Sequence, residues 1–319
     1  MNSNTVAADH GWEQSLSTRG GGGAGGYDGS EFQGTSRKVS FWPLFKHHLR
    51  DWVIIVIMAI LEIIDYVLVP PYHRFVSEHN INYFTFPSNK YTVPTWSVLV
   101  IAVIIPLLIF FLYFLRRRSI LDFHNAFLGL ATAITLTALL TDAIKNVVGM
   151  PRPNFFHTCF PDGIPQYSAD VDRRVICHPN SKSEYEDGYK SFPSGHASWC
   201  FAGLGYLSMY LAGKMGLFDK RGYSSRVFIV AMPLLLAALV SISRVDDYQH
   251  RWVDIIFAAL LGAAVGYFCY RTFYPSVYSE WAGLPHEYPP QSIFAHGQHP
   301  TSMPPAMQNG TNDVERGRM

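Results

Sequence analysis

The chain has 319 residues, of which 49% are hydrophobic and only 15% are Asp, Glu, Lys or Arg. Soluble domains usually contain about 25% charged residues, so this sequence carries too little charge for a surface that faces only water. The formal net charge of +1 gives no indication of nucleic-acid binding or of a strongly acidic partner.

Polar segments flank an apolar middle. Residues 1–40 are hydrophilic and include the run Gly20–Gly23, and their apolar content is too low to offset the entropy lost on ordering. No hydrophobic signal-peptide core occurs in the first thirty residues, so we expect a disordered tail without a leader. Residues 275–319 are rich in Pro, His and Gln and predict a second tail. Residues 41–274 are then the functional domain.

Six stretches of the middle region are candidates for crossing a bilayer, which takes about 20 mostly apolar residues. The fourth and fifth are short, and the six are Trp52–Val69, Trp96–Leu115, Ile120–Ile144, Ala197–Ala212, Val227–Ile242 and Val253–Phe273. A buried helical core of a soluble protein is the alternative, and it is disfavoured because the second stretch contains no charged residue. We therefore predict an all-α polytopic membrane protein with six transmembrane helices.

The basic residues predict the orientation of these helices, because Lys and Arg in short loops favour the cytosolic side. They precede the first stretch, follow the second and separate the fourth from the fifth: Arg37, Lys38, Lys46, Arg50, Arg116, Arg117, Arg118, Lys214, Lys220, Arg221 and Arg226. If six spans alternate, these groups share one face. We predict that this face and both tails are cytosolic, and that loops 145–194 and 244–252 are lumenal or extracellular.

Three polar clusters lie at the non-cytosolic ends of the last four stretches. They are Lys145 with Arg152-Pro153, then Phe192-Pro-Ser-Gly-His196, then Ser243-Arg244 with His250 and Asp254. A lone cation there is commonly an interfacial anchor, and a lone histidine is commonly a polar cap. Charged groups near a bilayer are costly and tend to mark function. Three cations, two histidines and one carboxylate at one face therefore predict an enzyme site.

These clusters have the spacing K-x6-RP, PSGH and SR-x5-H-x3-D, which resembles the type 2 phosphatidic acid phosphatase superfamily. No motif position departs from that pattern between Lys145 and Asp254. The superfamily includes lipid phosphate phosphatases, glucose-6-phosphatases, undecaprenyl pyrophosphate phosphatases and vanadium haloperoxidases. Segments Gly188–Trp199 and Arg244–Tyr248 are similar to lipid phosphate phosphatases of plants and fungi. The resemblance implies a haloperoxidase-like helical core that acts on phosphatidate, diacylglycerol pyrophosphate or lysophosphatidate.

The cationic residues suit the binding of a phosphoryl group, which carries its charge on three oxygens during transfer. Lys145, Arg152 and Arg244 can neutralise these oxygens, and the arginines can donate paired hydrogen bonds. Ser194 and the N–H of Gly195 lie where a helix begins, and a helix N-terminus favours an anion. We predict that these five residues bind the substrate phosphate.

The remaining motif residues suit catalysis. His250 is the expected nucleophile and would form a phosphohistidine, because neutral imidazole can attack phosphorus. Asp254 follows at i+4 on the same helix face and can fix the histidine tautomer. His196 is the expected general acid that protonates the leaving alkoxide. These roles agree with those that the resemblance implies.

The sequence predicts no metal ion or other cofactor, because three cations in one pocket would repel a divalent ion. The expected partners are a lipid phosphate and the bilayer. A polyprenyl pyrophosphate phosphatase and a sugar-phosphate phosphatase remain alternatives within the enzymes. A catalytically inactive lipid-phosphate binder or a transporter is the alternative of another class, and the motifs leave the oligomeric state open.

Other polar residues have two interpretations each. Cys159 and Cys177 share the long non-cytosolic loop and either form a disulfide or remain free thiols. Glu62 and Asp65, three apart in the first stretch, either pair with a neighbouring helix or, for Asp65, line the headgroup entrance. Between Arg244 and His250, the residues Asp246, Asp247 and Tyr248 either shape the pocket mouth or form a solvated turn.

Overall fold

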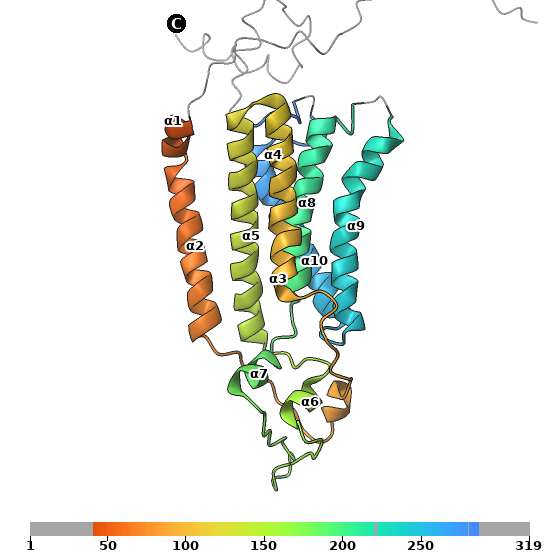
Figure 1. Cartoon of the computed structure of the whole chain (residues 1–319). Coiled ribbons are helices and arrows are strands. Elements are labelled where there is room, and N and C mark those ends of the chain that lie inside the picture. The colour runs from red at the N-terminus through yellow and green to blue at the C-terminus, as the bar shows by residue number, and fades with distance from the viewer. Residues whose placement is uncertain (1–40, 220–221, 280, 287–319) are drawn as a thin grey trace, which may run out of the picture. The chain divides into compact units, whose positions relative to one another are not determined.

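The computed structural model describes residues 41–219, 222–279 and 281–286 (Figure 1). The predicted tail 1–40 and most of the predicted tail 275–319 lie outside these residues. The helical elements are α1 (Phe41–His47), α2 (Leu49–Leu68), η1 (Ile81–Phe84), α3 (Thr95–Leu99), η2 (Val100–Ile104), α4 (Ile105–Arg117), α5 (Ile120–Val148), α6 (Phe155–Cys159), α7 (Lys182–Asp187), α8 (Gly195–Met215), α9 (Ser224–Asp246) and α10 (Trp252–Phe273). No strand is formed among the described residues, so the all-α prediction is confirmed for them.

Local sequence sets the ends of the long helices. Ser119 caps α5 by accepting a hydrogen bond from the backbone N–H of Asp122. The same helix ends at Gly149, which adopts a left-handed conformation with φ of 54° that glycine tolerates better than other residues. Elements α3, η2 and α4 follow one another without a break and form a single apolar helix over Thr95–Arg117.

Helix α8 is the centre of the bundle. It packs against α5, α9, α10 and the α3–η2–α4 helix, and Tyr206 and Tyr210 are fully buried along it. Two glycines permit the closest approaches. A Cβ added to Gly203 would lie 2.0 Å from the carbonyl oxygen of Ala102, and one added to Gly262 would lie 2.1 Å from that of Ser198. Any side chain at these glycines would therefore push the helices apart.

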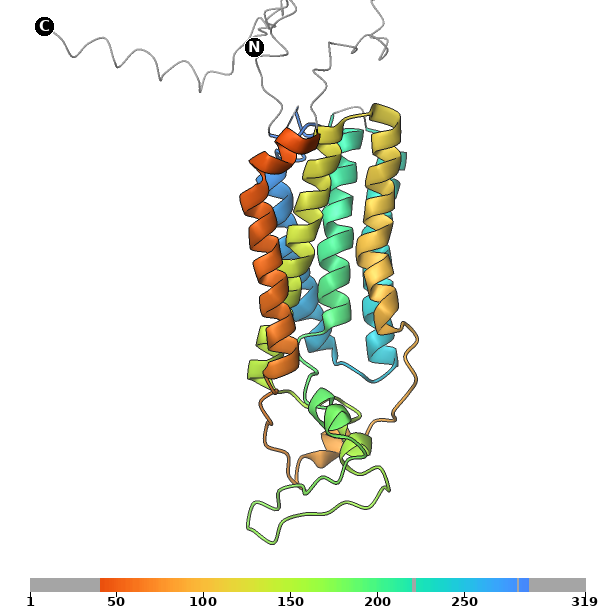
Figure 2. The same ribbon diagram turned by 60° about the vertical axis from the view of Figure 1, so that its left-hand side comes forward.

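Helix α2 stands at the edge of the bundle and packs against α5 (Figure 2). The predicted transmembrane stretches two, three, five and six are confirmed as helices that are long and apolar enough to cross a membrane: Thr95–Arg117, Ile120–Val148, Ser224–Asp246 and Trp252–Phe273. Their outward side chains are largely apolar and exposed in the isolated chain, as expected for surfaces that face lipid.

The first and fourth predicted stretches form helices α2 and α8, but these two are not among the helices apolar enough to meet that description. Helix α2 carries four charged residues, Arg50, Asp51, Glu62 and Asp65. Helix α8 is rich in Gly, Ser and Tyr. Because other helices enclose α8, its side chains do not need to be lipophilic. A count of six spans is therefore not confirmed.

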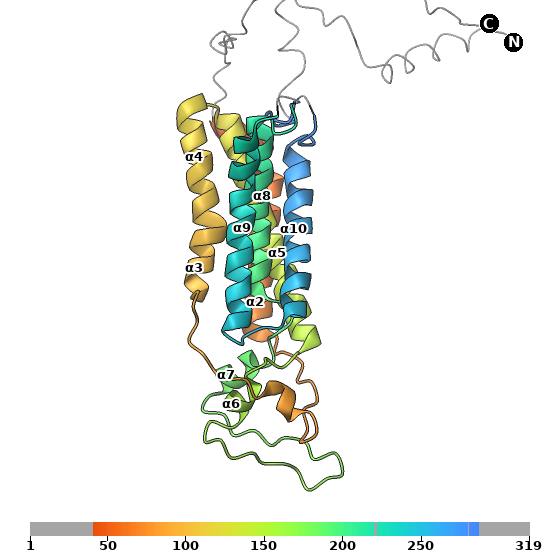
Figure 3. The ribbon, with the colours of Figure 1, turned by 90° about the vertical axis from the view of Figure 1, so that its right-hand side faces the viewer.

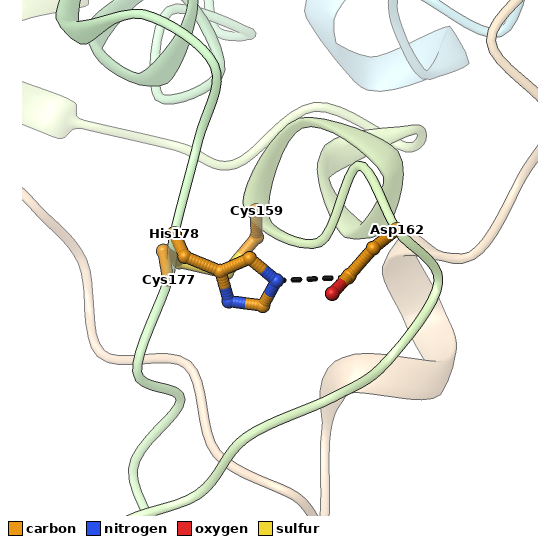
Figure 4. The surroundings of a disulfide bond; sticks show 4 residues. All are labelled: Cys159, Asp162, Cys177 and His178. Carbon is orange, nitrogen blue, oxygen red and sulfur yellow. Dashed lines mark hydrogen bonds and ion pairs between the residues drawn. A yellow bond between two sulfur atoms is a disulfide. The ribbon is translucent and has the colours of Figure 1, made fainter.

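Loops with η1, α6 and α7 gather at the end of the bundle where α8 begins (Figures 1 and 3). Cys159 and Cys177 form a disulfide there, which decides between the two interpretations of this pair (Figure 4). His178 lies beside the bridge and its Nε2 is 2.8 Å from Oδ1 of Asp162. Two isolated antiparallel β-bridges, Ser77 with Arg174 and Tyr167 with Val175, also connect the loop segments.

The described part of the predicted C-terminal tail, residues 275–279 and 281–286, returns to the opposite end of the bundle. Nζ of Lys214 donates to the carbonyl oxygen of Gly283 at 2.6 Å. The N–H of His286 donates to the carbonyl oxygen of Phe273 at 2.9 Å. Ala282 is buried. Packing against the helices thus extends beyond Tyr274, the last residue of the predicted functional domain.

Candidate active site

A cavity of about 430 Å³ lies at the loop end of the bundle. Six of the predicted site residues line it: Lys145, Arg152, Gly195, His196, Arg244 and His250. The other two, Ser194 and Asp254, are buried and lie behind the lining residues. The folded chain therefore brings together motif residues that are more than a hundred positions apart.

His250 is buried, and its Nδ1 lies 2.7 Å from the main-chain carbonyl oxygen of Ser191. A carbonyl only accepts hydrogen bonds, so Nδ1 carries the hydrogen and Nε2 keeps a free lone pair in the neutral ring. Burial, followed by the charges of Arg152 and Lys145, lowers the pKa of His250 from 6.5 to about 4. The ring is therefore uncharged at neutral pH.

Asp254 contacts His250 less directly than the sequence predicts. Its Oδ2 accepts hydrogen bonds from the hydroxyl of Ser191 at 2.6 Å and from the N–H of Arg251 at 2.9 Å. The same oxygen lies 3.8 Å from Nδ1 of His250, which is too long for a hydrogen bond. The carbonyl of Ser191 fixes the tautomer of His250, and Asp254 acts on it through charge and through Ser191.

His196 and Arg244 meet at one acceptor. The carbonyl oxygen of Val93 lies 3.2 Å from Nε2 of His196 and 3.2 Å from Nη1 of Arg244. The two nitrogens are 3.3 Å apart. Because both side chains can donate to the carbonyl, the loop that precedes α3 holds the predicted acid and one predicted phosphate ligand side by side.

Arg244 is almost fully buried, with 1% of its surface exposed. Its Nη2 pairs with Asp247, which also accepts hydrogen bonds from the N–H and the hydroxyl of Thr92. Burial acts to raise the pKa of Asp247, but the Thr92 hydrogen bonds and the Arg244 charge outweigh it and hold the pKa below the ordinary value. Nε of Arg244 has no hydrogen-bond partner among the described residues and remains able to bind an oxyanion.

Arg152 is fixed from two sides. Its Nε and Nη2 donate to the carbonyl and the carboxylate of Asp187 at 2.9 and 2.8 Å, and Nη1 donates to Oε1 of Gln249 at 2.8 Å. These bonds hold the guanidinium plane next to His250, because Gln249 is its neighbour in the chain. Arg152 can therefore present its remaining N–H groups without losing side-chain entropy on binding.

Lys145 lies beside the start of α8. Its Nζ is 3.5 Å from Oδ1 of Asp142 and 3.5 Å from where a Cβ on Gly195 would stand. A larger residue at position 195 would occupy the space in front of the ammonium group. Ser194 occupies the N-cap position of the same helix without a side-chain capping bond, and its N–H donates to the carbonyl of Asp254 at 3.2 Å. Its buried hydroxyl has no partner among the described residues.

Comparison with known proteins agrees with this geometry. Residues 126–278 match the PAP2 superfamily. Lipid phosphate phosphatase 2 of Arabidopsis thaliana is 44% identical over 243 residues, which are 76% of this chain and 83% of that protein. Probable lipid phosphate phosphatase 4 of the same plant is 42% identical over 79% of this chain and 81% of that protein. The chain belongs to the PAP2 superfamily.

A more distant relative is diacylglycerol pyrophosphate phosphatase 1 of Saccharomyces cerevisiae, which is 32% identical over 64% of this chain and 68% of that protein. No solved structure matches the chain. The PAP2 match begins at residue 126, whereas Glu62, Tyr66 and Tyr91 line the same cavity from earlier in the chain. The site of this PAP2 protein thus includes side chains outside the matched region.

Several residues that position the side chains of the site lie outside the three sequence motifs. Ser191 connects Asp254 with His250, and Val93 lies between His196 and Arg244. Asp187 holds Arg152. The only sequence signal for these residues is the closeness of Ser191 to the PSGH motif, since the contacts of Val93 and Asp187 depend on loops that fold back from distant positions.

The structure gives different outcomes for the acidic residues Glu62, Asp65 and Asp247, which the sequence left with two interpretations each. Asp65 accepts a hydrogen bond from Nδ2 of Asn146 on α5 at 3.0 Å, which is the helix-pairing interpretation. Glu62 lines the cavity together with Asp142. Asp247 is buried against Arg244, so the interpretation as a solvated turn is wrong for this residue.

Proposed function

We propose that this chain hydrolyses the phosphate ester of a lipid, with phosphatidate, diacylglycerol pyrophosphate and lysophosphatidate as the candidate substrates. Phosphatase activity agrees with its PAP2 membership and with the names of the relatives, which are lipid phosphate phosphatases and a diacylglycerol pyrophosphate phosphatase. The observation that carries the proposal is a buried, neutral His250 in one cavity with Lys145, Arg152 and Arg244.

The cations bind the phosphoryl group first. Lys145 contributes a point charge, while Arg152 and Arg244 contribute N–H groups that their carboxylate partners, Asp187 and Asp247, do not use. Fixed positive groups in a water-poor site stabilise the charge that develops on the equatorial oxygens without reorganising. The N–H groups at the start of α8 add partial positive charge from the helix N-terminus.

His250 then attacks through Nε2. The Ser191 carbonyl holds the hydrogen on Nδ1, so the lone pair of Nε2 is directed away from that contact and forms the new P–N bond. The P–O bond to the lipid breaks, and the ring becomes a cation whose charge Asp254 offsets from 3.8 Å.

His196 completes both half-reactions. Binding of a phosphate dianion favours its protonated form, and the ring gives a proton to the departing lipid oxygen. In the second half-reaction it removes a proton from the attacking water, and the P–N bond breaks to release inorganic phosphate and regenerate His250. Before the reaction, the Val93 carbonyl accepts the hydrogen bond from Nε2–H of His196. The leaving oxygen then takes the place of this carbonyl as the acceptor.

A lipid suits this cavity better than a free sugar phosphate. Tyr66 of α2, Val98 of α3 and Trp199 of α8 line it together with His196, so apolar and aromatic groups border the same cavity as the proposed acid. The acyl chains can then stay between the helices while the phosphate occupies the polar part. A polyprenyl pyrophosphate could use the same arrangement, and it stays an alternative substrate.

We infer six membrane spans, with residues 41–274 as the catalytic domain and 1–40 and 275–319 as cytosolic tails. Helix α2 carries exposed apolar residues along much of its length, and α8 lies inside the bundle between helices that are themselves apolar enough to cross. The Lys and Arg distribution favours a cytosolic position for the end away from the cavity. The active site would then open on the lumenal or extracellular side.

The proposal is tested with purified protein in detergent micelles. His250→Ala should lower phosphate release from phosphatidate by about 10⁴-fold, while His79→Ala, which removes an exposed histidine of the same loop side, should retain wild-type activity. Acid quenching of the wild type should trap a phosphohistidine that His250→Ala lacks. Turnover by His250→Ala would show that the nucleophile is wrongly assigned.

The same assay tests the other proposals. We propose that no metal ion takes part, so activity should persist in EDTA, and an absolute Mg²⁺ requirement would contradict this. Comparison of phosphatidate with diacylglycerol pyrophosphate, a polyprenyl pyrophosphate and a sugar phosphate decides the substrate. Failure to hydrolyse any of them, with binding retained, would favour the lipid-phosphate binder or the transporter.

A further inference from the structure

A second cavity of about 430 Å³ adjoins the catalytic cavity on the loop side of the molecule. It is built from segments 88–91, 152–158 and 184–188, which include parts of α6 and α7, and from Gln249, and most of its lining side chains are polar. Tyr91, Arg152 and Asp187 line both cavities. These three side chains therefore form the partition between the catalytic cavity and this outer cavity.

The proposed reaction, on which this inference rests, yields two products that need different surroundings. The lipid alcohol belongs in the bilayer, next to Tyr66, Val98 and Trp199. Inorganic phosphate is a doubly charged anion and can leave only into water, because apolar surroundings do not solvate it. Its route must begin at the cations that held the ester and must end outside the bundle.

Arg152 lies at the start of such a route. One N–H of its Nη1 is taken by Gln249 and one of its Nη2 by Asp187, and each of these nitrogens carries a second N–H. Because Arg152 lines both cavities, it can pass an oxyanion from one to the other. Tyr91 borders the same partition, with its ring 5.1 Å from Cζ of Arg244.

We propose that the outer cavity is a release site for inorganic phosphate. Lys90 supplies a second cation besides Arg152, and Asn89 and Thr158 supply neutral polar groups. Glu184 and Asp187 also line it, so its charge is mixed. Mixed charge makes the affinity for phosphate low, which suits a site that an anion must leave after each turnover.

The test is product inhibition by inorganic phosphate. In Lys90→Glu the inhibition constant for phosphate should rise by about tenfold, since the charge at the site is reversed. Exchange of ¹⁸O between phosphate and water, which needs phosphate to re-enter the catalytic cavity, should fall in parallel. Lys182→Glu is the matched control, because Lys182 is exposed on α7 and lines neither cavity. It should leave both measurements unchanged.

A single-turnover measurement keeps this inference apart from the proposed function. Release of the lipid alcohol in the first turnover should be the same in Lys90→Glu and in the wild type. If the wild type releases no lipid alcohol, the proposed function fails. If it does, and the inhibition constant and the ¹⁸O exchange of Lys90→Glu equal those of the wild type, the outer cavity is not the release site.

Should Lys90→Glu fail to fold, Thr158→Trp fills the same cavity from α6. It should retain the first-turnover burst of lipid alcohol and lose steady-state turnover, because phosphate release becomes rate-limiting. Val171→Trp, at a loop position that is 97% exposed, is its control and should behave as the wild type. Unchanged steady-state turnover in folded Thr158→Trp would overturn the proposal.

Discussion

Buried charges occur at both ends of the helical bundle, and the two clusters differ in how completely they are paired. At the end away from the cavity, Asp122 of α5 accepts hydrogen bonds from Tyr210 at 3.0 Å, from Tyr274 at 2.9 Å and from Nζ of Lys214 at 2.5 Å. Nζ of Lys214 also lies about 5 Å from three aromatic ring centres. Each charged group in this cluster has its partners inside the protein.

At the cavity end the cluster is incomplete. Nε of Arg244 and the hydroxyl of Ser194 are buried without a partner among the described residues, and Lys145 reaches Asp142 only at 3.5 Å. Leaving buried polar groups unpaired costs stability unless a ligand pairs them. We therefore expect the closed Asp122 cluster to stabilise the fold, and the open cluster to be available to the phosphate of the proposed substrate.

The largest expected effect is the loss of stability when the closed Asp122 cluster loses its cation. Lys214→Ala leaves Asp122 buried without its cation, and removing one partner of a buried pair costs about 3 to 5 kcal/mol in the free energy of unfolding. Denaturant unfolding in detergent measures it. Lys145→Ala is the matched variant at the open end and should change stability little while lowering kcat by about 10²-fold or more. Equal loss of stability in both variants would remove the distinction between the clusters.

A second expected effect concerns the segment between Arg152 and Asp187 at the open end, which a disulfide crosslinks. The Cys159–Cys177 disulfide spans 18 positions, and a closed loop of that length contributes about 3 kcal/mol by restricting the unfolded chain. The double variant Cys159→Ala with Cys177→Ala should lose that amount, and reductant should destabilise only the wild type. Cys269→Ala, which removes a buried free thiol, is the control. Reductant-insensitive unfolding of the wild type would contradict the prediction.

The open end should also make stability depend on pH. The pKa of folded His250 is about 4, below the ordinary 6.5, chiefly because of burial. Between these values the unfolded chain binds a proton that the folded chain does not, so the free energy of unfolding falls as the pH falls through this window, by about 2 kcal/mol at pH 5. His250→Gln, which cannot titrate, should lose correspondingly less between pH 7 and 5. Identical losses would place the pKa of His250 near 6.5.

Motif spacing and hydropathy predict much of this molecule. Four helices that are long and apolar enough to cross a membrane were recognisable, because each contains a long run of apolar residues. The six cavity-lining motif residues were recognisable because the chemistry fixes their types and local spacing. Helix α8 was harder to delimit. Its Tyr206 and Tyr210 are buried inside the bundle. Hydropathy therefore does not indicate where this helix begins and ends in a membrane.

The contacts that connect the motifs could not be predicted. The acceptor for His250 is a main-chain carbonyl of Ser191, and any residue type would supply one. Thr92 and Asp247 meet across 155 positions, which depends on the path of an exposed loop rather than on a local pattern. The sequence therefore predicts which motif residues line the cavity better than it predicts the contacts that position them.

The smallest expected effect concerns one of these positioning contacts, the hydrogen bond from the Ser191 hydroxyl to Asp254. Ser191→Ala keeps the carbonyl that fixes the His250 tautomer but removes the hydroxyl that donates to Asp254. Loss of one hydrogen bond to a charged group costs about 1.5 kcal/mol, so kcat should fall by about tenfold. Asp254, freed of one donor, should also interact more strongly with His250, raise its pKa and move the acid limb of kcat/KM to higher pH.

Ser191→Thr retains the hydroxyl and should restore both kcat and the pH profile. A merely structural role for Ser191 would lower the amount of folded protein without moving the acid limb. The pH profile therefore distinguishes positioning from packing, and an unshifted acid limb in folded Ser191→Ala would show that Asp254 does not depend on Ser191. It would also weaken the contrast between the two ends, since the position of Asp254 would then be fixed by the N–H of Arg251 alone.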